Sequence, residues 1–432
     1  MSAATATAAR KHVVIVDANA NGVDALAIAR ARGYEVTFVR SAQLAGYADA
    51  GVLDRAAAQA DRVVAMANSA DPRALLDAMR RLHAVHPIDA FVCPWELPVA
   101  ATASVAARLA VPFTSAGAVD CCRNKPMARE LLRQGAVPSA AFATAMNPDE
   151  ALAAAARIGF PLVLKPASGT GSMMASVCRD AASLREALAQ YWRTLDAEPP
   201  AMQHLLAGPL LLEEWLDGHM VSAELVADSA GLRVLTITDR QRGRDNEILE
   251  LGSMMPADLE PAQRDAVAAY ALTAAQALGL DLGIFHLEIM LTTRGPRLVE
   301  ANPRVMGGSA RALIRSTFGI EILETLFDIH VDARAPVDLG RQRCWSASHI
   351  IGGRHAQVLA RDFAPQLLQP YGDAIVAFAF APRAGAPVPQ YRNNYDAVGA
   401  FTVRADSAAA ARTLRDAILA LVEDATGLVL VR

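Results

Sequence analysis

The segment FHLEIMLTTRGPRLVEANPR, at residues 285–304, restricts the possible folds more than any other part of the chain. Apolar and polar residues alternate on both sides of Thr293–Pro296. This pattern predicts two antiparallel strands joined by a tight turn. We expect the turn to centre on Arg294, which fixes the pairs of residues that face each other across the hairpin.

Four polar side chains of this hairpin are expected on one face of the sheet. Glu288 would lie opposite Glu300, and two residues further from the turn His286 would lie opposite Asn302. Opposed residues have Cβ atoms about 4.5–5.5 Å apart, so two carboxylates repel each other unless a cation lies between them. Mg²⁺ is the natural candidate, because it binds carboxylate, amide and phosphate oxygens. An ordinary surface hairpin is the alternative, and four matched polar positions argue against it.

Cations next to this hairpin and elsewhere suggest binding of anions. Arg304 follows Pro303 and offers a planar fork of donors to a carboxylate or a phosphoryl group. The chain has only three lysines, Lys11, Lys125 and Lys165, and its other basic residues are arginines. Lys165 ends an apolar strand before a loop of small residues that could approach phosphate oxygens. Lys125, at a predicted helix start, would alone more often be a solvated residue, but the scarcity of lysine favours a specific role for both.

The first 115 residues or so alternate apolar strands with helical stretches, which is typical of a parallel α/β unit. The first strand is followed by a turn, residues 17–22, that contains only one glycine, so the dinucleotide-binding fingerprint is absent and a dehydrogenase is disfavoured. The strands of this unit are expected at 12–16, 34–39, 62–66 and 88–93.

Composition excludes several other classes of protein. The chain is 53% hydrophobic with a formal net charge of −4, and it has no basic stripe, so nucleic acid and anionic membrane surfaces are not expected as partners. No apolar run reaches the length of a membrane span, and residues 1–11 lack the apolar core of a signal peptide. The five cysteines form no metal-binding or disulfide pattern. A cytoplasmic protein is the expectation.

Taken together and in order, these motifs resemble the ATP-grasp superfamily. The match covers about residues 10 to 330 and runs through Asn124–Lys125, Lys165–Pro166 with its loop, Glu213–Glu214 with Gly218, and finally 286–304. The resemblance implies an α/β ATP-grasp fold with an N-terminal Rossmann-like domain (1–117) and a two-subdomain ATP-binding core. The core would consist of a lid-bearing subdomain (118–208) and a metal-site subdomain (209–331), followed by a C-terminal α+β domain (332–432).

The resemblance also implies a nucleotide site. Lys125 and Lys165 would contact the phosphates of ATP, the loop 168–172 would cover them as a lid, and Glu213–Leu216 would form the hinge strand that reads adenine, with the Glu213 side chain or the backbone meeting its amino edge. The residues expected to bind the nucleotide are Lys125, Lys165, Ser168, Gly169, Thr170, Gly171, Ser172, Glu213, Glu214, Trp215, Leu216 and Glu224.

By the same resemblance, Glu288, Glu300 and Asn302 would hold Mg²⁺, for which Mn²⁺ is a substitute. Arg304 would steady an acyl phosphate and the tetrahedral intermediate, and Lys165 would share the catalytic role. The residues expected at the substrate are His286, Arg304, Gly307, Gly308 and Glu250. His286 is equally well read from its sequence as a structural histidine.

Within the superfamily, the chain is most similar to the L-amino acid ligases, which join amino acids into dipeptides. The similar features are His286 before the first metal-site glutamate, Gly307–Gly308 after the Asn-Pro-Arg motif, a C-terminal domain of this size, and the segment Glu250–Pro256. Two departures leave the lid and the substrate choice open. Where Gly-x-Glu is usual after the hinge, Gly218 is followed by His219 and Met220, and Met173–Ala175 stands where a Gly-Val pair is usual.

The sequence therefore predicts an ATP- and Mg²⁺-dependent, ADP-forming ligase that activates a carboxylate as an acyl phosphate and couples it to an amine. Both substrates are expected to be small molecules, amino acids by resemblance, in a dipeptide or natural-product pathway. Two alternatives stay open: a carboxylase-type or purine-pathway ATP-grasp enzyme, and a nucleotide-binding protein without turnover. A homodimer through the C-terminal strands is also open.

Overall fold

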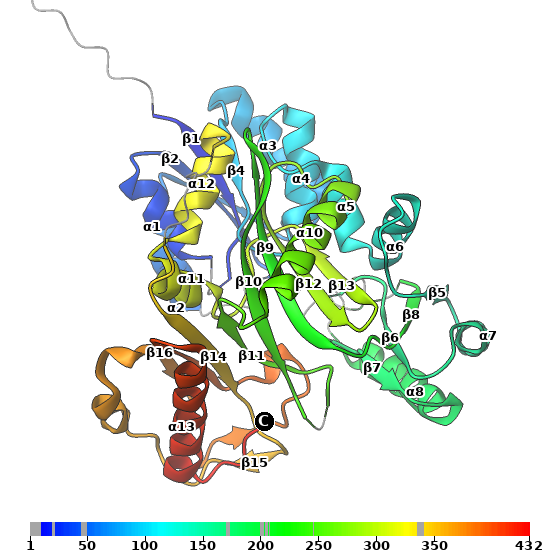
Figure 1. The fold of residues 1–432 in the computed structure, drawn as a ribbon. Coiled ribbons are helices and arrows are strands. Elements are labelled where there is room, and N and C mark those ends of the chain that lie inside the picture. The colour runs from blue at the N-terminus through cyan, green and yellow to red at the C-terminus, as the bar shows by residue number, and fades with distance from the viewer. Residues whose placement is uncertain are drawn as a thin grey trace, which may run out of the picture.

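The computed structural model describes residues 10–19, 22–44, 50–169, 173–198, 203, 206, 208–244, 246–334 and 341–432. The N-terminal unit is a four-stranded parallel sheet in the order β3-β2-β1-β4, flanked by helices (Figure 1). Its strands agree with the predicted ones to within two residues. The elements are β1 (His12–Val16), α1 (Asp24–Ala31), β2 (Glu35–Ser41), α2 (Ala50–Ala57), β3 (Arg62–Met66), α3 (Pro72–Val85), β4 (Ala90–Val92) and α4 (Val99–Leu109).

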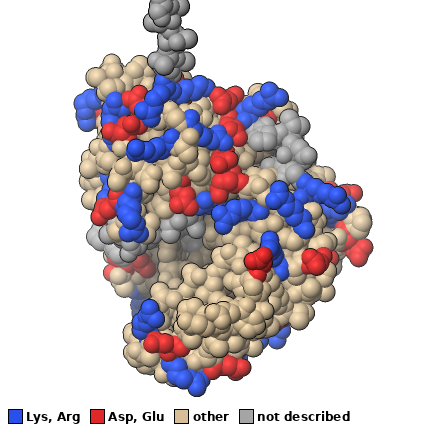
Figure 2. All heavy atoms as spheres, turned by 90° about the vertical axis from the view of Figure 1, so that its left-hand side faces the viewer, with Lys and Arg blue, Asp and Glu red and all other residues tan. Residues whose placement is uncertain are grey.

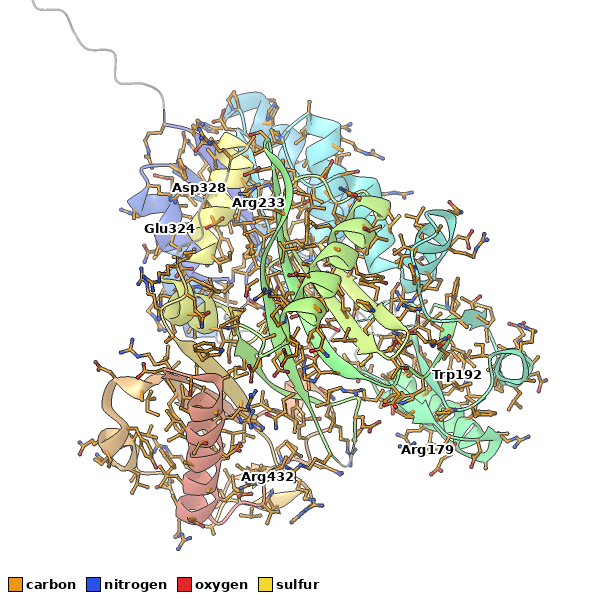
Figure 3. The ribbon with its side chains drawn as sticks, in the orientation of Figure 1. Arg179, Trp192, Arg233, Glu324, Asp328 and Arg432 are labelled. Carbon is orange, nitrogen blue, oxygen red and sulfur yellow. The ribbon has the colours of Figure 1, made fainter. Side chains whose placement is uncertain are left out.

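A smaller unit follows, with an antiparallel sheet in the order β5-β8-β6-β7. Its helix α6 begins where predicted, because the Asn124 side chain accepts a hydrogen bond from the Met127 N–H and Pro126 occupies the first turn. The elements are α5 (Ala116–Arg123), α6 (Lys125–Gln134), β5 (Phe142–Ala145), α7 (Pro148–Ile158), β6 (Leu162–Pro166), β7 (Ser176–Cys178), α8 (Ala181–Ala197) and β8 (Leu210–Glu214). Arg179 and Trp192 mark this unit in Figure 3.

The largest element is an eight-stranded sheet in the order β13-β12-β9-β10-β11-β14-β18-β16. The predicted domain boundary at residue 332 lies between α12 and β14, but the pairing of β11 with β14 carries the sheet across it. The strands are β9 (His219–Asp228), β10 (Gly231–Arg242), β11 (Glu250–Met255), β12 (Gly283–Thr292), β13 (Gly295–Asn302), β14 (Trp345–Ile351), β16 (Ile375–Phe380) and β18 (Gly399–Ala405).

Helices cover this sheet at different places (Figure 1). They are α10 (Pro261–Ala277), α11 (Ala310–Phe318), α12 (Ile322–Asp332) and α13 (Ala408–Thr426), with two 3₁₀ segments (Pro365–Ala374 and Asn394–Asp396) and a small ribbon of β15 (Gln357–Val358) and β17 (Pro387–Val388). The connection between β16 and β18 contains β17 and the second 3₁₀ segment, so it is more elaborate than the simple hairpin loop predicted at 382–389. Among the described residues, no helix is long and apolar enough to cross a membrane.

Helix α12 packs on the N-terminal sheet and joins it to the core. Phe327 lies in one buried cluster with Val13 and Phe38, and its ring centroid is 5.9 Å from that of Tyr34. Arg32 pairs with Asp328 at 2.5 Å and with Glu324 at 3.7 Å; the two acids are labelled in Figure 3. The N-terminal unit is therefore held against α12 by apolar packing and by ion pairs.

The hairpin of β12 and β13 has the predicted pairs but a different turn. Glu288 faces Glu300 and His286 faces Asn302, as expected. The turn, however, lies between Thr292 and Gly295 rather than on Arg294, and the register shifts by one residue between Glu288 and Ile289. This β-bulge restores the predicted pairing, because it adds one residue to β13 before Glu300 is reached.

Candidate active site

Two cavities meet at the β12–β13 hairpin. The hinge cavity lies between the small sheet and the large one, and the inter-domain cavity lies between the N-terminal unit, the hairpin and the C-terminal strands. Glu250, Glu288 and Glu300 line both. The hinge cavity is lined by Lys125, Val163, Lys165, Pro166, Gly169, Met173, Ala175, Glu213–Leu216, Met220, Arg242, Glu247, Ile248, Glu250, Glu288, Met290, Val299 and Glu300.

Both predicted lysines line the hinge cavity, and both contact carboxylates. Lys165 Nζ lies 2.5 Å from Glu213 Oε2, and Lys125 Nζ lies 2.9 Å from Glu300 Oε1. Burial lowers the pKa of Lys165 despite the charge of Glu213. The two ammonium groups thus lie on one side of the cavity, where they can meet an anionic ligand if it displaces or neutralises their carboxylate partners.

The side chain of Glu213 lines the hinge cavity but is held there by two cations. It is buried between Lys165 and Arg129, whose Nε donates to Glu213 Oε1 at 2.5 Å. Burial alone would raise the pKa of Glu213, but these two cations hold it at about 2. A carboxylate with two cationic partners is poorly placed to read an adenine amino group, so the backbone of the hinge strand is the better candidate for that contact.

The other three residues of the predicted hinge strand also line the cavity. Glu214 accepts a hydrogen bond from the Ala141 N–H at 2.9 Å and also pairs with Arg294. The guanidinium of Arg242 lies 5.5 Å from the centre of the Trp215 ring, in cation–π contact. Apolar side chains, among them Leu216, Met220 and Met290, also line this cavity.

His286 bridges two glutamates and does not act alone. Its Nδ1 lies 3.0 Å from Glu224 Oε2 and its Nε2 lies 3.3 Å from Glu288 Oε1. Burial would lower the pKa of His286, but the two carboxylates raise it to about 9, so the ring is a cation at neutral pH. Glu224 is buried behind His286 and also accepts from Ser222 Oγ at 2.7 Å. Glu224 lines neither cavity, so the prediction that it binds the nucleotide does not fit its position; it orients His286 instead.

Arg304 reaches the N-terminal unit. Its Nε donates to Glu96 Oε2 at 3.0 Å, and a terminal nitrogen donates to Asn302 Oδ1 at 3.3 Å. Arg123 also pairs with Glu96. Burial would raise the pKa of Glu96, but Arg304 and Arg123 hold it at about 2. This cluster lies at the inter-domain cavity, beside the paired acids of the hairpin.

Glu250 pairs with Arg240, whose guanidinium also donates to Ser253 Oγ at 3.0 Å. Burial raises the pKa of Glu250 despite this arginine. Gly307 and Gly308 line the inter-domain cavity together with Arg304 and Glu250, as the predicted substrate residues should.

The predicted lid lies only partly within the described chain, whereas the predicted metal ligands all lie within it. Gly169 lines the hinge cavity, Ser168 does not, and Thr170, Gly171 and Ser172 fall outside the described residues. No group of three or more His, Cys, Asp or Glu side chains that could hold a metal occurs among the residues described. Glu288, Glu300 and Asn302 nevertheless come together on one face of the hairpin.

Sequence reasoning missed three charged residues of the site. Glu96 follows β4, at the carboxyl edge of a parallel sheet where ligands usually bind, and that was an available signal. Arg240 is a charged residue on a strand in the middle of a sheet, which was a weaker signal. Arg129 lies on the amphipathic helix α6 and gave no signal of its buried contact with Glu213.

Comparison with known proteins places the chain in a family. Residues 158–312 match the ATP-grasp domain, and residues 26–113 match the ATP-grasp N-terminal domain. With the two-sheet core and the paired acids of the hairpin, these matches show that the chain belongs to the ATP-grasp family.

Individual relatives are more distant. The chain is 25% identical over 312 residues to the protein y4rH of Sinorhizobium fredii, covering 70% of this chain and 61% of that protein. It is 30% identical over 255 residues to carnosine synthase 1 of Gallus gallus, covering 57% of this chain and 27% of the other. The chain thus spans less than two thirds of the length of either relative.

Solved structures share the fold. An L-amino acid ligase from Bacillus licheniformis superposes with a TM-score of 0.77 at 19% identity, over 95% of this chain and 98% of that one. The ADP complex of an N5-carboxyaminoimidazole ribonucleotide synthetase gives a TM-score of 0.71 at 16% identity, over 96% and 97% of the two chains. At these identities the likeness concerns the fold alone.

Proposed function

We propose that this protein is an ATP-dependent, ADP-forming ligase that joins a carboxylate to an amine, with amino acids as the substrates. The observation that carries the proposal is that Glu288 and Glu300 line both cavities. A phosphoryl group transferred from a nucleotide in the hinge cavity to a carboxylate in the inter-domain cavity must pass the point where the cavities meet. The similarity to carnosine synthase 1 and the fold of the L-amino acid ligase support this choice of chemistry.

The hinge cavity suits ATP. Its apolar side chains can enclose adenine next to Trp215, and Lys125 and Lys165 can meet the phosphates. In the described structure, both lysines neutralise carboxylates, which keeps the site from holding unpaired buried cations before a nucleotide arrives. ATP phosphates would take over as the partners of these lysines.

The donor set on the hairpin fits Mg²⁺. Glu288, Glu300 and Asn302 present two carboxylates and one amide oxygen on one face, and Mg²⁺ prefers such oxygen ligands, completed by water and phosphate. When bound there, the ion would neutralise the charge that develops on the transferred phosphoryl group. Displacement of Lys125 from Glu300 would accompany metal binding, which also frees the ammonium group for a phosphate oxygen.

The residues around Arg304 would carry the second half of the reaction. Attack of the carboxylate on the γ-phosphorus of ATP forms an acyl phosphate and releases ADP. Attack of the amine nitrogen on the acyl carbon then breaks the bond to phosphate and forms the amide, with loss of one proton from the amine. Arg304 can stabilise the oxyanion of this step, and Glu96 holds its guanidinium in place.

The test is release of ADP and phosphate from Mg-ATP across a matrix of amino-acid pairs, with products read by mass spectrometry. A pair that stimulates release and yields the sum of the two masses minus water would establish the ligase. ATP consumption that depends on bicarbonate, or ATP binding with no turnover on any pair, would point to the two alternative functions and contradict the proposal.

A further inference from the structure

The lining of the inter-domain cavity changes from charged at one end to uncharged at the other. Its charged lining residues lie on the N-terminal unit, on the hairpin and its neighbouring strands, and on α11. On the C-terminal strands, the described lining residues include one titratable side chain, His349. That ring stacks on Phe401 with centroids 6.3 Å apart, and burial lowers its pKa to about 4, so it is neutral at pH 7.

Six residues of the C-terminal strands form two rows on one face of the sheet. Hydrogen-bonded register places Ser348 beside Thr402 and Thr402 beside Ala377, and it places Ile350 beside Ala400 and Ala400 beside Ala379. All six line the inter-domain cavity. We call these residues the neutral patch: Ser348, Ile350, Ala377, Ala379, Ala400 and Thr402.

The side chains of the neutral patch face the cavity because their sequence neighbours face the other way. Phe378 and Phe401 point to the opposite side of the sheet, where Phe363 stacks on Phe378 with ring centroids 4.8 Å apart. Strand side chains alternate between faces, so Ala377, Ala379 and Ala400 turn toward the cavity. Ser348 and Thr402 are buried, whereas the three alanines and Ile350 are at least partly exposed, so the accessible part of the patch is an uncharged wall of mostly short side chains.

The distance between the neutral patch and the strand of Glu250 sets a minimum length for a group that reaches the patch from the junction of the cavities. In the sheet, β11 is followed by β14, β18 and β16, and neighbouring strands lie about 4.8 Å apart, so β16 lies about 14 Å from the strand of Glu250. An extended residue spans only about 3.5 Å of chain. A group that reaches from the junction of the two cavities to Ala379 must therefore be much larger than an alanine side chain.

The outer surface of the C-terminal unit also has few charged residues on the side shown in Figure 2. Figure 2 shows the side of the molecule that carries α1, α11 and β16, and the middle of its lower half, on the C-terminal unit, is largely without Lys, Arg, Asp or Glu. Trp95 and the half-exposed Tyr395 add aromatic surface to the lining of the cavity.

We propose that the neutral patch is a side-chain subsite for a large uncharged group on one of the two molecules that the enzyme couples. Substrates of this class are bulky neutral amino acids or short neutral peptides, favoured over small or charged ones. Apolar surface gains by leaving water against such a wall, whereas a charged group there would lose hydration without gaining a partner on the patch itself, and a cation would also meet Arg315 of α11, which lines the same cavity. This inference rests on the proposed ligase function.

The experiment measures kcat/KM for ATP-dependent coupling with a graded panel in each substrate position: alanine, leucine, phenylalanine, tryptophan, glutamate, lysine and the dipeptide Ala-Phe. For one position, we expect kcat/KM to rise at least about tenfold from alanine to phenylalanine or Ala-Phe, and to fall about tenfold from phenylalanine to glutamate or lysine. Ala379→Leu should lower the phenylalanine-to-alanine ratio about tenfold, and Ala379→Glu should favour lysine over phenylalanine.

Ala409→Leu on the exposed face of α13 is the matched control, because it adds the same bulk to the C-terminal unit outside the cavity. Its substrate ratios should equal those of the wild type. A wild-type enzyme that prefers alanine or lysine in both positions would overturn the subsite. Ratios that are unchanged by both Ala379 variants would do the same.

A binding measurement separates the subsite from the ligase function. Calorimetric titration of N-acetyl-phenylalanine and of phenylalanine amide, with a non-hydrolysable ATP analogue present, compares the wild type with Ala379→Leu. Binding of either probe that the variant weakens, without turnover on any pair, would contradict the ligase and support the subsite. Turnover without any side-chain preference and equal probe binding in both proteins would support the ligase and contradict the subsite.

Discussion

The hinge cavity and the inter-domain cavity differ in how their residues are arranged along the chain. Most of the hinge cavity comes from short motifs, each of which places its charged residue at a strand or helix end, such as Lys125, Lys165 and Glu300. The inter-domain cavity draws on segments from Asn19 to Thr402, and its key contact joins Glu96 to Arg304 across 208 residues. Motifs therefore locate the first cavity, whereas only the folded chain brings the second together.

The largest loss of activity is expected from substitution of Glu300, a residue that lines both cavities. Glu300→Gln should lower turnover by about 1,000-fold or more, because the amide removes one charge from the proposed metal site and weakens the pairing with Lys125. Activity assays and thermal melting would check that the loss occurs in a folded protein. Glu186→Gln, on the exposed surface of α8, is the control. Near-normal activity of Glu300→Gln would contradict the role of the hairpin.

The two cavities should respond alike to acid. Glu96 and Glu213 have pKa values lowered to about 2, so each contributes stability that is present above its ordinary pKa of 4.5 and is lost as the pH falls from 4.5 toward 2. The contribution of each buried pair is on the order of 3 kcal/mol. We expect the Tm to fall steeply in this range, and less steeply in Glu213→Gln, which starts from a lower Tm. Parallel curves for the two proteins would contradict the assignment.

Removal of one lysine of the hinge cavity should affect nucleotide binding specifically. Lys165→Ala should weaken ATP binding about 10- to 100-fold, because a charge-assisted contact to phosphate is lost. Calorimetry with ATP measures this directly. Lys11→Ala is a matched control, since Lys11 pairs with Asp332 on the surface and neither residue lines a cavity. Unchanged nucleotide affinity in Lys165→Ala would refute its phosphate contact.

A change in the inter-domain cavity should have the opposite effect: it should impair substrate binding and leave ATP binding intact. Glu96→Gln keeps the shape of the side chain but loosens Arg304, so KM for the proposed amino-acid substrates should rise about tenfold while the affinity for ATP stays within about twofold. Kinetics with each substrate varied in turn, together with ATP calorimetry, would check both halves. An equal loss of ATP affinity would show that the two cavities do not act as separate binding sites.

The sequence predicted the elements with strong local signals. The hairpin pairs, the start of α6 and the four N-terminal strands follow from alternation, capping and apolar runs. It could not predict that Glu213 turns toward Arg129, because that contact depends on how α6 packs on the small sheet. Nor could it predict Glu224 behind His286, since both residues become neighbours only when β9 and β12 pair.

The predicted division into a core and a C-terminal domain is also incomplete for a physical reason. Residue 332 looks like a boundary because α12 ends there, but backbone hydrogen bonds between β11 and β14 continue the sheet beyond it. Strand pairing between distant segments leaves no local pattern in the residues that form it. The bulge beside Glu288 was missed for the same reason.

The continuous eight-stranded sheet has a mechanical consequence. The paired acids of β12 and β13 lie near one edge of this sheet, and the neutral patch lies near the other edge. Because continuous backbone hydrogen bonds join the strands between them, we expect the distance between the acids and the patch to stay nearly constant. The four-stranded sheet with Lys165 is hydrogen-bonded separately from the eight-stranded sheet. A hinge motion that closes the enzyme over ATP would therefore move the sheet of Lys165 relative to the eight-stranded sheet. The substrate subsite and the paired acids would keep their positions relative to each other during that motion.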